Sequence, residues 1–450
     1  MRRREFLRAM GIGAWAGVSA LLVACRRAEA PTPTAAEVPS PTVAVGQVPS
    51  PIATTPAVTE KLTLELWDQQ QSDLNIQQAY IKALEDFQQE NPDIVVKVTT
   101  TPYAQYRDKL LVAVQGGRGP DIMSLDEIWT PEFAAAGIIE PLDPYIQRSA
   151  SVKPDAFFKP AWDTNLWQKQ IWGIPLNFDV WEQLFYNADH FREAGLDPDK
   201  PPRTWDEWLE ALPQLTAPPQ RFGIGLLGHK GEDTVVMLNS LMYSNGGAII
   251  DEDGNVVIYS QENIETLEFY LKLSKYAPEG VANVGEAEAV SLFAAGKVSM
   301  ILDGQWQQDT MNARATFDWR IAVPPAPAGK KFIGALGGWN LAINKASKNK
   351  DVAFRLIEYL TTNKEVQKTI NSLTPALRVA GEEFVKEKRR QPEVILETLT
   401  SGRPRPISPV YPQVSDIEQQ MVQAILSGTP VEEALQKAQR DIEKVVKSAR

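Results

Sequence analysis

Three aspartates in this sequence stand at the ends of strand-like runs, and two of them have a tryptophan close by. They are Asp68 after Trp67, Asp126 with Trp129 nearby, and Asp179. A carboxylate can accept two hydrogen bonds from the hydroxyls of one pyranose, and hydrogen bonds to charged groups contribute about 1.5–3 kcal/mol each. The apolar C–H face of a sugar packs on a flat aromatic ring. These residue types favour binding of a neutral carbohydrate, and a cationic ligand such as a polyamine also fits.

A single aspartate at a strand end is more often a helix cap than part of a site. Here the pairing of a carboxylate with an aromatic ring recurs, and that repetition favours a binding site. The same carboxylates would repel a phosphate or sulfate group, which disfavours an anionic ligand.

Strands and helices must alternate along the chain to position these aspartates. The residue pattern predicts strands at 62–67, 94–99 and 121–125, with helices at 74–90 and 106–115 between them. This βαβαβ order indicates a parallel sheet covered by helices, in which ligands bind at the carboxyl ends of the strands. The three aspartates are expected at such ends.

A second run of alternating elements follows, and the chain is mostly helical from about residue 349 onward. The pattern predicts strands at 171–178, 183–186, 222–227 and 298–302, and helices at 205–215, 232–244 and 261–276. The fold class is therefore α/β. The length of 450 residues allows two or three domain-sized units.

The composition excludes several classes of function. There are 46 Lys and Arg against 57 Asp and Glu, and the net charge of −11 argues against nucleic acid as a partner, because phosphate binding needs clustered cations. The single cysteine, Cys25, excludes an internal disulfide and a thiolate zinc site. The two histidines, His190 and His229, lie far apart in the sequence. We expect neither a metal site nor a cofactor.

Residues 1–24 have the features of an export signal. Residues 2–8 are basic, with Arg3 and Arg4 placed as in the twin-arginine motif. The uncharged run 9–24 is shorter than the roughly 20 residues that a membrane-spanning helix needs. The general secretory route is the alternative to twin-arginine export.

The signal ends in Leu-Val-Ala-Cys, which resembles the lipobox of bacterial lipoproteins, so Cys25 is the predicted lipidation site. Residues 25–60 are rich in Pro and Thr and contain no aromatic residue, which predicts a disordered tether. The mature protein is then exported and anchored to the outer face of the cell membrane, extracellular or periplasmic, without spanning that membrane.

Several segments resemble, in order, the landmarks of one protein family. Among them are FQQENPDIVVKV (87–98), YRDKLLVAVQGGRGPDIMSLD (106–126), WGIPLNFDVWEQLFYN (172–187), FAAGKVSMILDGQW (293–306) and LGGWNLAIN (336–344). The chain resembles the extracellular solute-binding proteins of ABC importers, in the carbohydrate group that includes maltose-, trehalose- and glycerol-phosphate-binding proteins.

The resemblance implies a two-lobed periplasmic-binding-protein fold of the maltose-binding type. Each lobe would be a sheet covered by helices, with the ligand cleft at the hinge. Lobe 1 is expected to comprise residues 61–177 and 325–382, and lobe 2 residues 178–324 and 383–450. The chain would cross between the lobes near residues 177–180, 323–326 and 380–390.

The same resemblance implies which residues line the cleft. They are Asp126, Asp179, Trp306, Gly338 and Trp339, together with Asp68, Arg378 and Arg405. Trp306 and Trp339 would stack on sugar rings, and Gly338 would offer a backbone contact. Ordinary core packing is the alternative for these two tryptophans, and it is the prediction for Trp205 and Trp208.

The function that the resemblance implies is capture of a neutral sugar by hinge closure and delivery to an ABC permease. The segment RPRPISPVYPQV (403–414) is most similar to the trehalose and maltose branch, which favours a disaccharide such as trehalose or maltose, or a short oligosaccharide. A binder of glycerol phosphate or another polyol, a secreted glycoside hydrolase and a surface adhesin are the alternatives. The expected protein is a monomer, is not an enzyme, and contacts the membrane only through the lipid at Cys25.

Overall fold

The computed structural model describes residues 61–448 except 70–73 and 252. The predicted signal peptide, the lipidation site Cys25 and the tether lie outside the described residues, so these three features stay predictions. Within the described part of the chain, no helix combines the length and the apolar character that crossing a membrane requires.

A six-stranded sheet carries most of the predicted site. Its strands, in the order β11-β6-β10-β3-β1-β2, are β11 (Thr374–Pro375), β6 (Ile174–Val180), β10 (Leu336–Ile343), β3 (Ile122–Asp126), β1 (Leu62–Gln69) and β2 (Ile94–Thr101). Strands β1, β2 and β3 pair in parallel, which confirms the parallel arrangement predicted for residues 62–125. Strand β10 enters from a distant part of the chain and lies antiparallel to both β3 and β6, and β11 lies antiparallel to β6. The complete sheet is therefore mixed, with β10 and β11 reversed.

A second sheet has three antiparallel strands, β7 (Gln183–Asn187), β8 (Met300–Asp303) and β9 (Trp319–Ala322), in the order β8-β7-β9. The predicted strand at 222–227 is not part of it. Phe222 and Gly225 form only single bridges, to Val298 and Ile301. Glycine weakens a strand and allows close backbone approach, which accounts for the irregular path of this segment.

The predicted strand at 171–178 is divided in two. A small hairpin of β4 (Leu166–Trp167) and β5 (Gln170–Ile171) precedes β6, and Trp172-Gly173 separates β5 from β6. A Cβ at Gly173 would lie 2.5 Å from the side-chain oxygen of Asn165, so the chain needs a glycine where it turns into β6.

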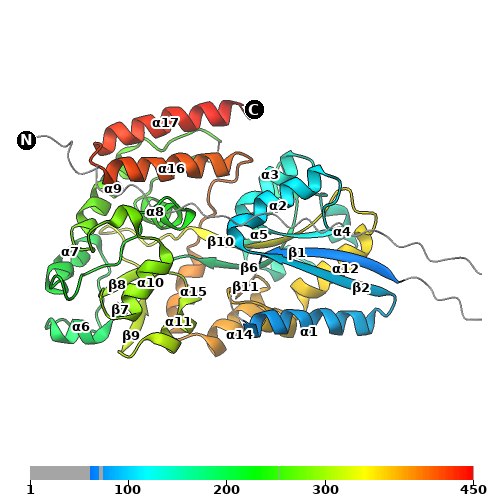
Figure 1. Ribbon diagram of the computed structural model, residues 1–450, viewed down its shortest axis with the longest axis horizontal. Helices are drawn as coiled ribbons and strands as arrows, with labels where there is room; N and C mark the ends of the chain where they lie inside the picture. Colours follow the sequence, from blue (N-terminus) through cyan, green and yellow to red (C-terminus); the bar gives the residue numbers. More distant parts are fainter. Residues whose placement is uncertain (1–60, 70–73, 252, 449–450) are drawn as a thin grey trace, which may run out of the picture. The chain divides into compact units, whose positions relative to one another are not determined.

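Helices cover both faces of the six-stranded sheet, and Figure 1 shows α1 and α2 on opposite sides of it. These helices are α1 (Leu74–Glu90), α2 (Tyr103–Gln115), η1 (Glu127–Trp129), α3 (Thr130–Ala135), α4 (Asp143–Arg148), η2 (Pro154–Ala156), α5 (Lys159–Asp163), α12 (Lys350–Thr362), α13 (Lys364–Ile370) and α14 (Arg378–Lys388). Helices α12 and α13 both contact α1, and α12 also packs on β6 and β10.

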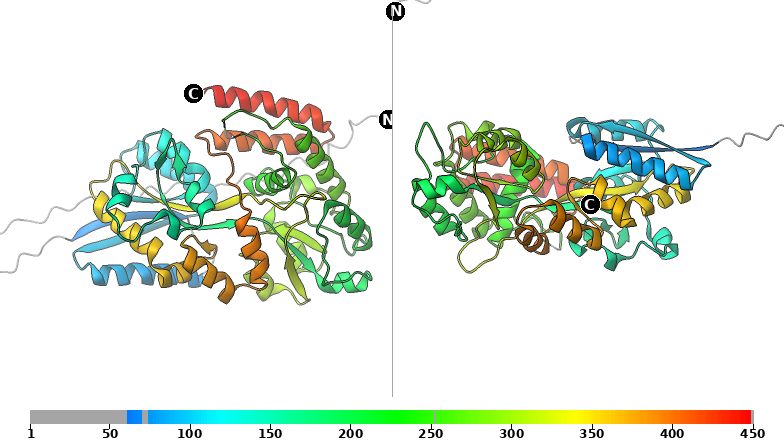
Figure 2. Two further views of the ribbon diagram at one scale, coloured as in Figure 1. Left: turned by 180° about the vertical axis from the view of Figure 1, so that it is seen from behind. Right: turned by 90° about the horizontal axis from the view of Figure 1, so that it is seen from below.

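The remaining helices surround the three-stranded sheet. They are α6 (Ala188–Glu193), α7 (Trp205–Gln214), α8 (Glu232–Ser244), α9 (Gln261–Ser274), η3 (Val281–Asn283), α10 (Glu286–Ala294), α11 (Gln307–Arg314), α15 (Pro392–Thr400), α16 (Tyr411–Leu426) and α17 (Val431–Ser448). Figures 1 and 2 show α16 and α17 side by side, and these helices pack on α8 and α9 respectively.

Local sequence explains where α7 begins and what it buries. The Thr204 side chain accepts from the backbone N–H of Glu207, and the Glu207 carboxylate accepts from the backbone N–H of Thr204. This reciprocal capping box satisfies two otherwise unpaired donors. Trp205 stacks on Phe269 with ring centroids 4.1 Å apart, and Trp208 is fully buried. The prediction of core packing for Trp205 and Trp208 is confirmed.

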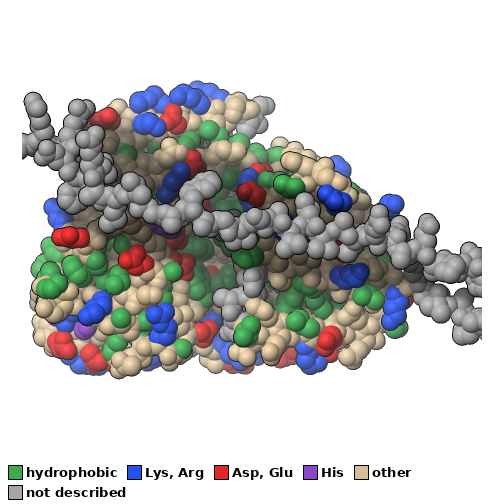
Figure 3. Space-filling view, viewed as in Figure 1, with side chains coloured by type: hydrophobic (Ala, Val, Ile, Leu, Met, Phe, Trp, Pro, Cys, Tyr) green, Lys and Arg blue, Asp and Glu red, His purple; other side chains and the backbone are tan. Residues whose placement is uncertain are grey.

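Helix α17 is amphipathic. Its buried residues recur every three or four positions and are Val431, Ala434, Leu435, Ala438 and Ile442. Figure 3 shows Lys and Arg side chains gathered along the outer side of this helix. The apolar stripe therefore holds α17 against α16 and α9, while the basic side chains stay in solvent.

The described residues form one compact unit, and three stretches of it join the two sheets. Residues 181–182 link β6 to β7, and residues 323–335 link β9 to β10. The third predicted crossing, near 380–390, coincides with the end of α14 and the start of α15, and α15 contacts both β6 and β7. The lobe boundary predicted after residue 382 falls inside α14; the boundaries of the lobes stay a prediction.

Candidate functional site

The strand register gathers several predicted site residues on one face of the six-stranded sheet. Trp339 of β10 pairs with Asp126 of β3 on one side and with Asn177 of β6 on the other. Two residues earlier on β10, Gly337 pairs with Asp179. Side chains directly opposite each other in neighbouring strands share a face, and alternate positions along a strand do too. Asp126, Trp339 and Asp179 therefore lie on the same face.

Asp68 lies on this face as well. In the β1–β3 register Trp67 is opposite Met123, so the next pair places Asp68 opposite Ser124. Asp68 is only 4% exposed, and burial raises its pKa to about 6. Its carboxylate accepts a hydrogen bond of 2.8 Å from the backbone N–H of Gln69. Asp68 therefore lies below the surface of the site, opposite Ser124, which precedes Asp126 on β3 by two residues.

Trp339 forms a right-angled arrangement of aromatic rings with Trp129 and Tyr103, which we call the first aromatic corner. The Trp339 ring meets the Trp129 ring at 86° with centroids 5.9 Å apart, and meets the Tyr103 ring at 86° over 6.1 Å. Tyr103 and Trp129 stack on each other at 5.5 Å. Tyr103 is 42% exposed, and Trp339 is half-buried. The corner thus presents aromatic surface to solvent.

Asp126 lies at this corner, and its two oxygens are already oriented. The Tyr103 hydroxyl donates to Oδ2 over 3.0 Å, and the backbone N–H of Ile128 donates to Oδ1 over 3.3 Å. The second contact makes Asp126 the cap of η1, as strand-end aspartates often are. Capping and ligand binding are compatible here, because each carboxylate oxygen can accept more than one hydrogen bond.

Arg405 is fully engaged by protein oxygens. Its Nη2 lies 3.3 Å from an oxygen of Asp126 and 3.4 Å from one of Glu127, and its Nη1 lies 2.7 Å from Glu232. Its Nε donates to the carbonyl of Leu336 over 3.0 Å. Arg405 is 2% exposed. In this conformation Arg405 orients Asp126, and each of its three guanidinium nitrogens already contacts a protein oxygen.

The carboxylates around Arg405 outnumber the single cation. Burial raises the pKa of Glu127 to about 7 and raises that of Asp126, while the nearby guanidinium opposes both shifts. Glu232 also accepts hydrogen bonds from Tyr411 over 2.7 Å and from Ser415. The acidic surroundings disfavour an anionic ligand at this corner.

A second aromatic corner is formed by Trp181 and Trp306. Their rings meet at 75° with centroids 5.2 Å apart. The Trp306 indole N–H donates to Glu286 over 3.0 Å, and the Gln307 amide donates to the same oxygen over 2.8 Å. Glu286 is the first residue of α10, and its backbone N–H donates to Asp233 over 2.9 Å. Glu286 therefore fixes the plane of the Trp306 ring.

Two glycines of β10 permit close approach between the strands and Trp181. A Cβ at Gly338 would lie 2.5 Å from the carbonyl oxygen of Asn177. A Cβ at Gly337 would lie 1.8 Å from the indole nitrogen of Trp181. Gly338 thus holds β6 and β10 close together, and Gly337 provides the space that the Trp181 ring occupies.

Asp179 and Arg378 do not face a shared opening. Asp179 is fully buried, neither of its carboxyl oxygens has a hydrogen-bond partner among the described residues, and burial raises its pKa to about 8. Burial therefore favours the protonated form of this carboxyl group. Arg378 is exposed, donates to the carbonyl of Phe157 over 3.2 Å and lies over the ring of Phe158.

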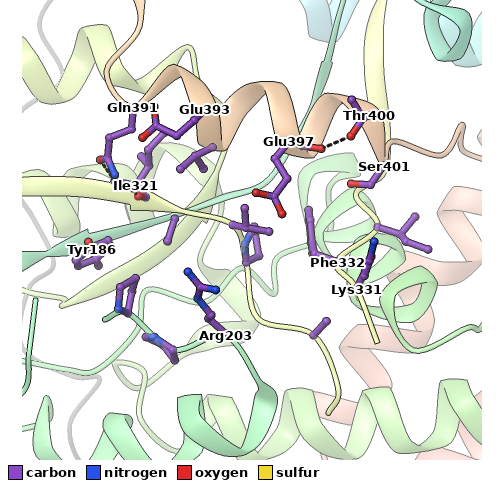
Figure 4. Close-up of a pocket in the computed structure, with 18 of the residues that line it drawn as sticks. Tyr186, Arg203, Ile321, Lys331, Phe332, Gln391, Glu393, Glu397, Thr400 and Ser401 are labelled. Atoms are coloured by element: carbon purple, nitrogen blue, oxygen red, sulfur yellow. Dashed lines mark hydrogen bonds between the residues drawn. The ribbon is translucent and has the colours of Figure 1, made fainter. Parts of the chain in front are cut away.

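The largest cavity that we describe, about 1050 Å³, contains none of the predicted site residues. Figure 4 shows it between β9, the stretch 323–333 and α15. Its mixed lining includes Arg203, Lys331 and Glu397. At its rim the Gln391 amide both donates to and accepts from the backbone of Ile321, each over 2.8 Å.

Four residues that contribute to the site were not predicted. Trp181 stands two positions after Asp179, so the pairing of carboxylate and tryptophan that singled out Asp68 and Asp126 also applied there. Tyr103, Glu232 and Glu286 carried no comparable signal, because their contacts depend on distant parts of the chain. Among the described residues no group of three or more His, Cys, Asp or Glu is placed to hold a metal ion.

Comparison with known proteins identifies relatives over most of the chain. The family described as bacterial extracellular solute-binding protein matches residues 72–367. A mannitol-binding protein of Pseudomonas aeruginosa is 26% identical over 286 residues, covering 61% of this chain and 64% of that protein. An arabinooligosaccharide-binding protein of Bacillus subtilis is 22% identical over 312 residues, covering 66% of this chain and 69% of that protein.

Solved structures of solute-binding proteins share the fold of this chain. An ABC transporter solute-binding protein from Thermotoga lettingae, bound with α-D-tagatose, superimposes with a TM-score of 0.75 at 29% identity, covering 86% of this chain and 100% of the other. Maltose-bound MalE3 of T. maritima gives 0.73 at 26%, covering 85% and 100%. The predicted two-lobed α/β fold of the periplasmic-binding type is confirmed. The chain belongs to the family of bacterial extracellular solute-binding proteins.

Proposed function

We propose that this protein captures a neutral sugar, a disaccharide or short oligosaccharide, and delivers it to an ABC permease. The observation that supports this most strongly is Asp126, a carboxylate held by Tyr103 and Arg405 beside the first aromatic corner. Relatives that bind maltose, tagatose, arabino-oligosaccharides or mannitol support the same ligand class.

The chemistry at the first aromatic corner suits a pyranose. The free lone pairs of Asp126 accept sugar hydroxyls, and the Tyr103 oxygen, whose proton is donated to Asp126, can accept a further hydrogen bond. The face of Trp339 takes the apolar C–H surface of the ring. Because both Asp126 oxygens already have protein donors, the carboxylate does not need to reorganise when a sugar arrives, which lowers the cost of binding.

Capture proceeds by hinge closure. Asp126 and Trp339 belong to the six-stranded sheet, whereas Trp306 follows β8 of the three-stranded sheet. A ligand that touches both aromatic corners binds the closed arrangement better than the open one and shifts the population toward it. Micromolar affinity corresponds to roughly −8 kcal/mol, which a few charge-assisted hydrogen bonds and one or two stacked rings can supply.

Export and anchoring complete the proposal. The family is extracellular, and the predicted signal peptide and lipidated Cys25 would hold the protein beside its permease. The predicted tether, residues 25–60, would give the folded part freedom to meet the permease. We propose that the protein acts as a monomer.

A polyol is the second candidate ligand. The Pseudomonas aeruginosa relative is a mannitol-binding protein, and an acyclic polyol offers the same hydroxyl donors to Asp126 without requiring a stacked ring. Its phosphate ester would face the carboxylates of Asp126, Glu127 and Glu232, whose only ion-pair partner among the described residues is Arg405.

Calorimetric titration of the purified protein with mono-, di- and trisaccharides, mannitol and glycerol phosphates tests the proposal. We expect saturable binding of a neutral sugar that is strongly weakened in Asp126→Ala and in Trp339→Ala. Asp155→Ala, which removes an exposed carboxylate elsewhere, is the matched control and should bind normally. Binding of only a phosphorylated polyol, or equal binding by Asp126→Ala, would contradict the proposal.

A further inference from the structure

We propose that Trp181 determines specificity: its indole forms a central stacking surface between Trp339 and Trp306, so that the site prefers sugars of two or more rings over monosaccharides. The inference rests on the proposed function, sugar binding. It assigns a role to a residue of the first crossing between the sheets, and it specifies how many rings the ligand has.

The position of Trp181 follows from Gly337. The indole nitrogen lies 1.8 Å from the point that a Cβ of residue 337 would occupy, so the ring covers β10 on the face toward which position 337 points. Trp339 is two residues further along and points to the same face, about 7 Å away at the ordinary rise of a strand. The two indoles are therefore neighbours along one face of β10.

The other side of Trp181 meets Trp306. The two rings are 5.2 Å apart at 75°, and Glu286 holds the Trp306 indole N–H. The backbone N–H of Trp181 donates to the carbonyl of Ala335 over 3.2 Å, which joins the first crossing to the second. The three indoles thus follow one another from the six-stranded sheet to the three-stranded sheet.

Trp181 differs from the tryptophans of the core. Trp205 and Trp208 are buried, whereas Trp181 is half-buried. In the described part of the chain, no oxygen accepts a hydrogen bond from the Trp181 indole N–H. This nitrogen is also not one of the fully buried polar atoms that lack a partner. Part of the Trp181 side chain is therefore open to solvent, as contact with a ligand requires.

The spacing of the three indole rings determines how many sugar rings the preferred ligand has. One sugar ring on Trp339, with its hydroxyls on Asp126, leaves Trp181 and Trp306 uncovered. A second ring along the chain of the sugar reaches Trp181, and a third lies toward Trp306. Stacking on Trp181 therefore adds affinity only when the ligand has a second ring.

Titration calorimetry with glucose, maltose and maltotriose tests the inference, or the same series built from whichever sugar the parent binds. Trp181→Ala should weaken disaccharide binding about tenfold, as loss of one aromatic contact implies, and should change monosaccharide binding by about twofold at most. Trp181→Phe should recover most of the disaccharide affinity. Trp167→Ala, a half-buried tryptophan of the β4–β5 hairpin, is the control and should leave all three affinities unchanged.

Gly337→Ala provides a test that keeps the tryptophan. Its added methyl group must displace the Trp181 ring, so the disaccharide should lose about as much affinity as in Trp181→Ala. In the Trp181→Ala background the same substitution should cost little more, because the ring that it displaces is gone.

The outcomes separate this inference from the proposed function. If the parent binds sugars but Trp181→Ala lowers the affinity for mono- and disaccharides equally, or lowers neither affinity, the role of Trp181 is wrong and sugar binding stands. Additive losses in the double variant would also contradict it. If the parent binds no sugar of any length, the proposed function fails and this inference fails with it.

Discussion

Arg405 and Glu232 form an ion pair of 2.7 Å that joins the segment before α16 to the first residue of α8. The same guanidinium contacts Asp126 at the end of β3, so one buried cation connects parts of the chain that pack on the two different sheets. Glu232 in turn accepts from Tyr411 at the start of α16.

Removal of Arg405 should destabilise the protein strongly. Arg405→Ala leaves the buried carboxylates of Asp126 and Glu127, and the half-buried one of Glu232, without their cation. Losing one partner of a buried ion pair costs about 3–5 kcal/mol. Denaturant unfolding followed by circular dichroism measures this loss. Arg378→Ala, which removes an exposed arginine, should change the free energy of unfolding by no more than about 0.5 kcal/mol. Equal effects of the two substitutions would contradict the central role of Arg405.

Glu286 should control the affinity of the site through Trp306. Glu286→Ala removes the acceptor of the Trp306 indole N–H, and we expect disaccharide binding to weaken about tenfold, which corresponds to about 1.4 kcal/mol. Glu286→Gln keeps an acceptor oxygen and should recover most of the affinity. The exposed Glu288 on the same helix supplies the control, Glu288→Ala, which should titrate like the parent. Full affinity in Glu286→Ala would show that Trp306 needs no such support.

Stability should fall as the pH rises from about 4 to about 8. Burial raises the pKa of Asp179 and of Glu182 to about 8 and raises that of Asp303. In that interval the folded protein retains protons that the unfolded chain has released, so each pH unit costs on the order of 1 kcal/mol per group. Below about pH 4 both states are protonated, and this contribution is fully present.

Urea unfolding at pH 5 and at pH 8 measures this dependence. Asp179→Asn replaces a carboxyl group that is neutral in the folded state with a neutral amide, so it should reduce the difference between the two pH values. Asp155→Asn, at an exposed position, should leave the difference unchanged. A parent protein that is more stable at pH 8 than at pH 5 would contradict the prediction.

Gly338 should tolerate no side chain. In Gly338→Ala the new methyl group would lie 2.5 Å from the carbonyl oxygen of Asn177, so β6 and β10 must move apart, and overpacking of this kind costs about 1–3 kcal/mol. We also expect weaker sugar binding, because Trp339 is the next residue. Gly117→Ala is the comparison: it meets no neighbouring atom at a positive φ of 67°, so it should lose stability but keep its affinity. Unchanged sugar affinity in Gly338→Ala would count against the site on β10.

The first elements were predictable because their signals are local. The alternation of residues 62–67 and the helical spacing of residues 74–90 gave β1 and α1 within about two residues at each end. The antiparallel insertion of β10 was not predictable in this way, because its partners β3 and β6 are more than a hundred residues distant in the sequence. Pairing between distant strands depends on tertiary packing and leaves no periodic pattern.

The candidate site shows the same division between local and distant information. Asp126 and Trp339 were predicted, and the register places them opposite each other. Arg405 was predicted to line the cleft, and the structure shows its guanidinium occupied by carboxylates that sequence spacing could not bring together. Asp179 was predicted as a ligand contact, yet its burial is decided by the packing around β6 and β10. Its role in binding stays a prediction.

The contact between Gln391 and Ile321 has a consequence for solubility. Strand β9 lies at the edge of the three-stranded sheet, and the free backbone groups of an edge strand are a template for pairing with another molecule. The amide of Gln391 occupies both the N–H and the carbonyl of Ile321, as a neighbouring strand would. A second copy that approaches this edge finds the two backbone groups of Ile321 already satisfied, so the Gln391 side chain removes one pairing position from the edge.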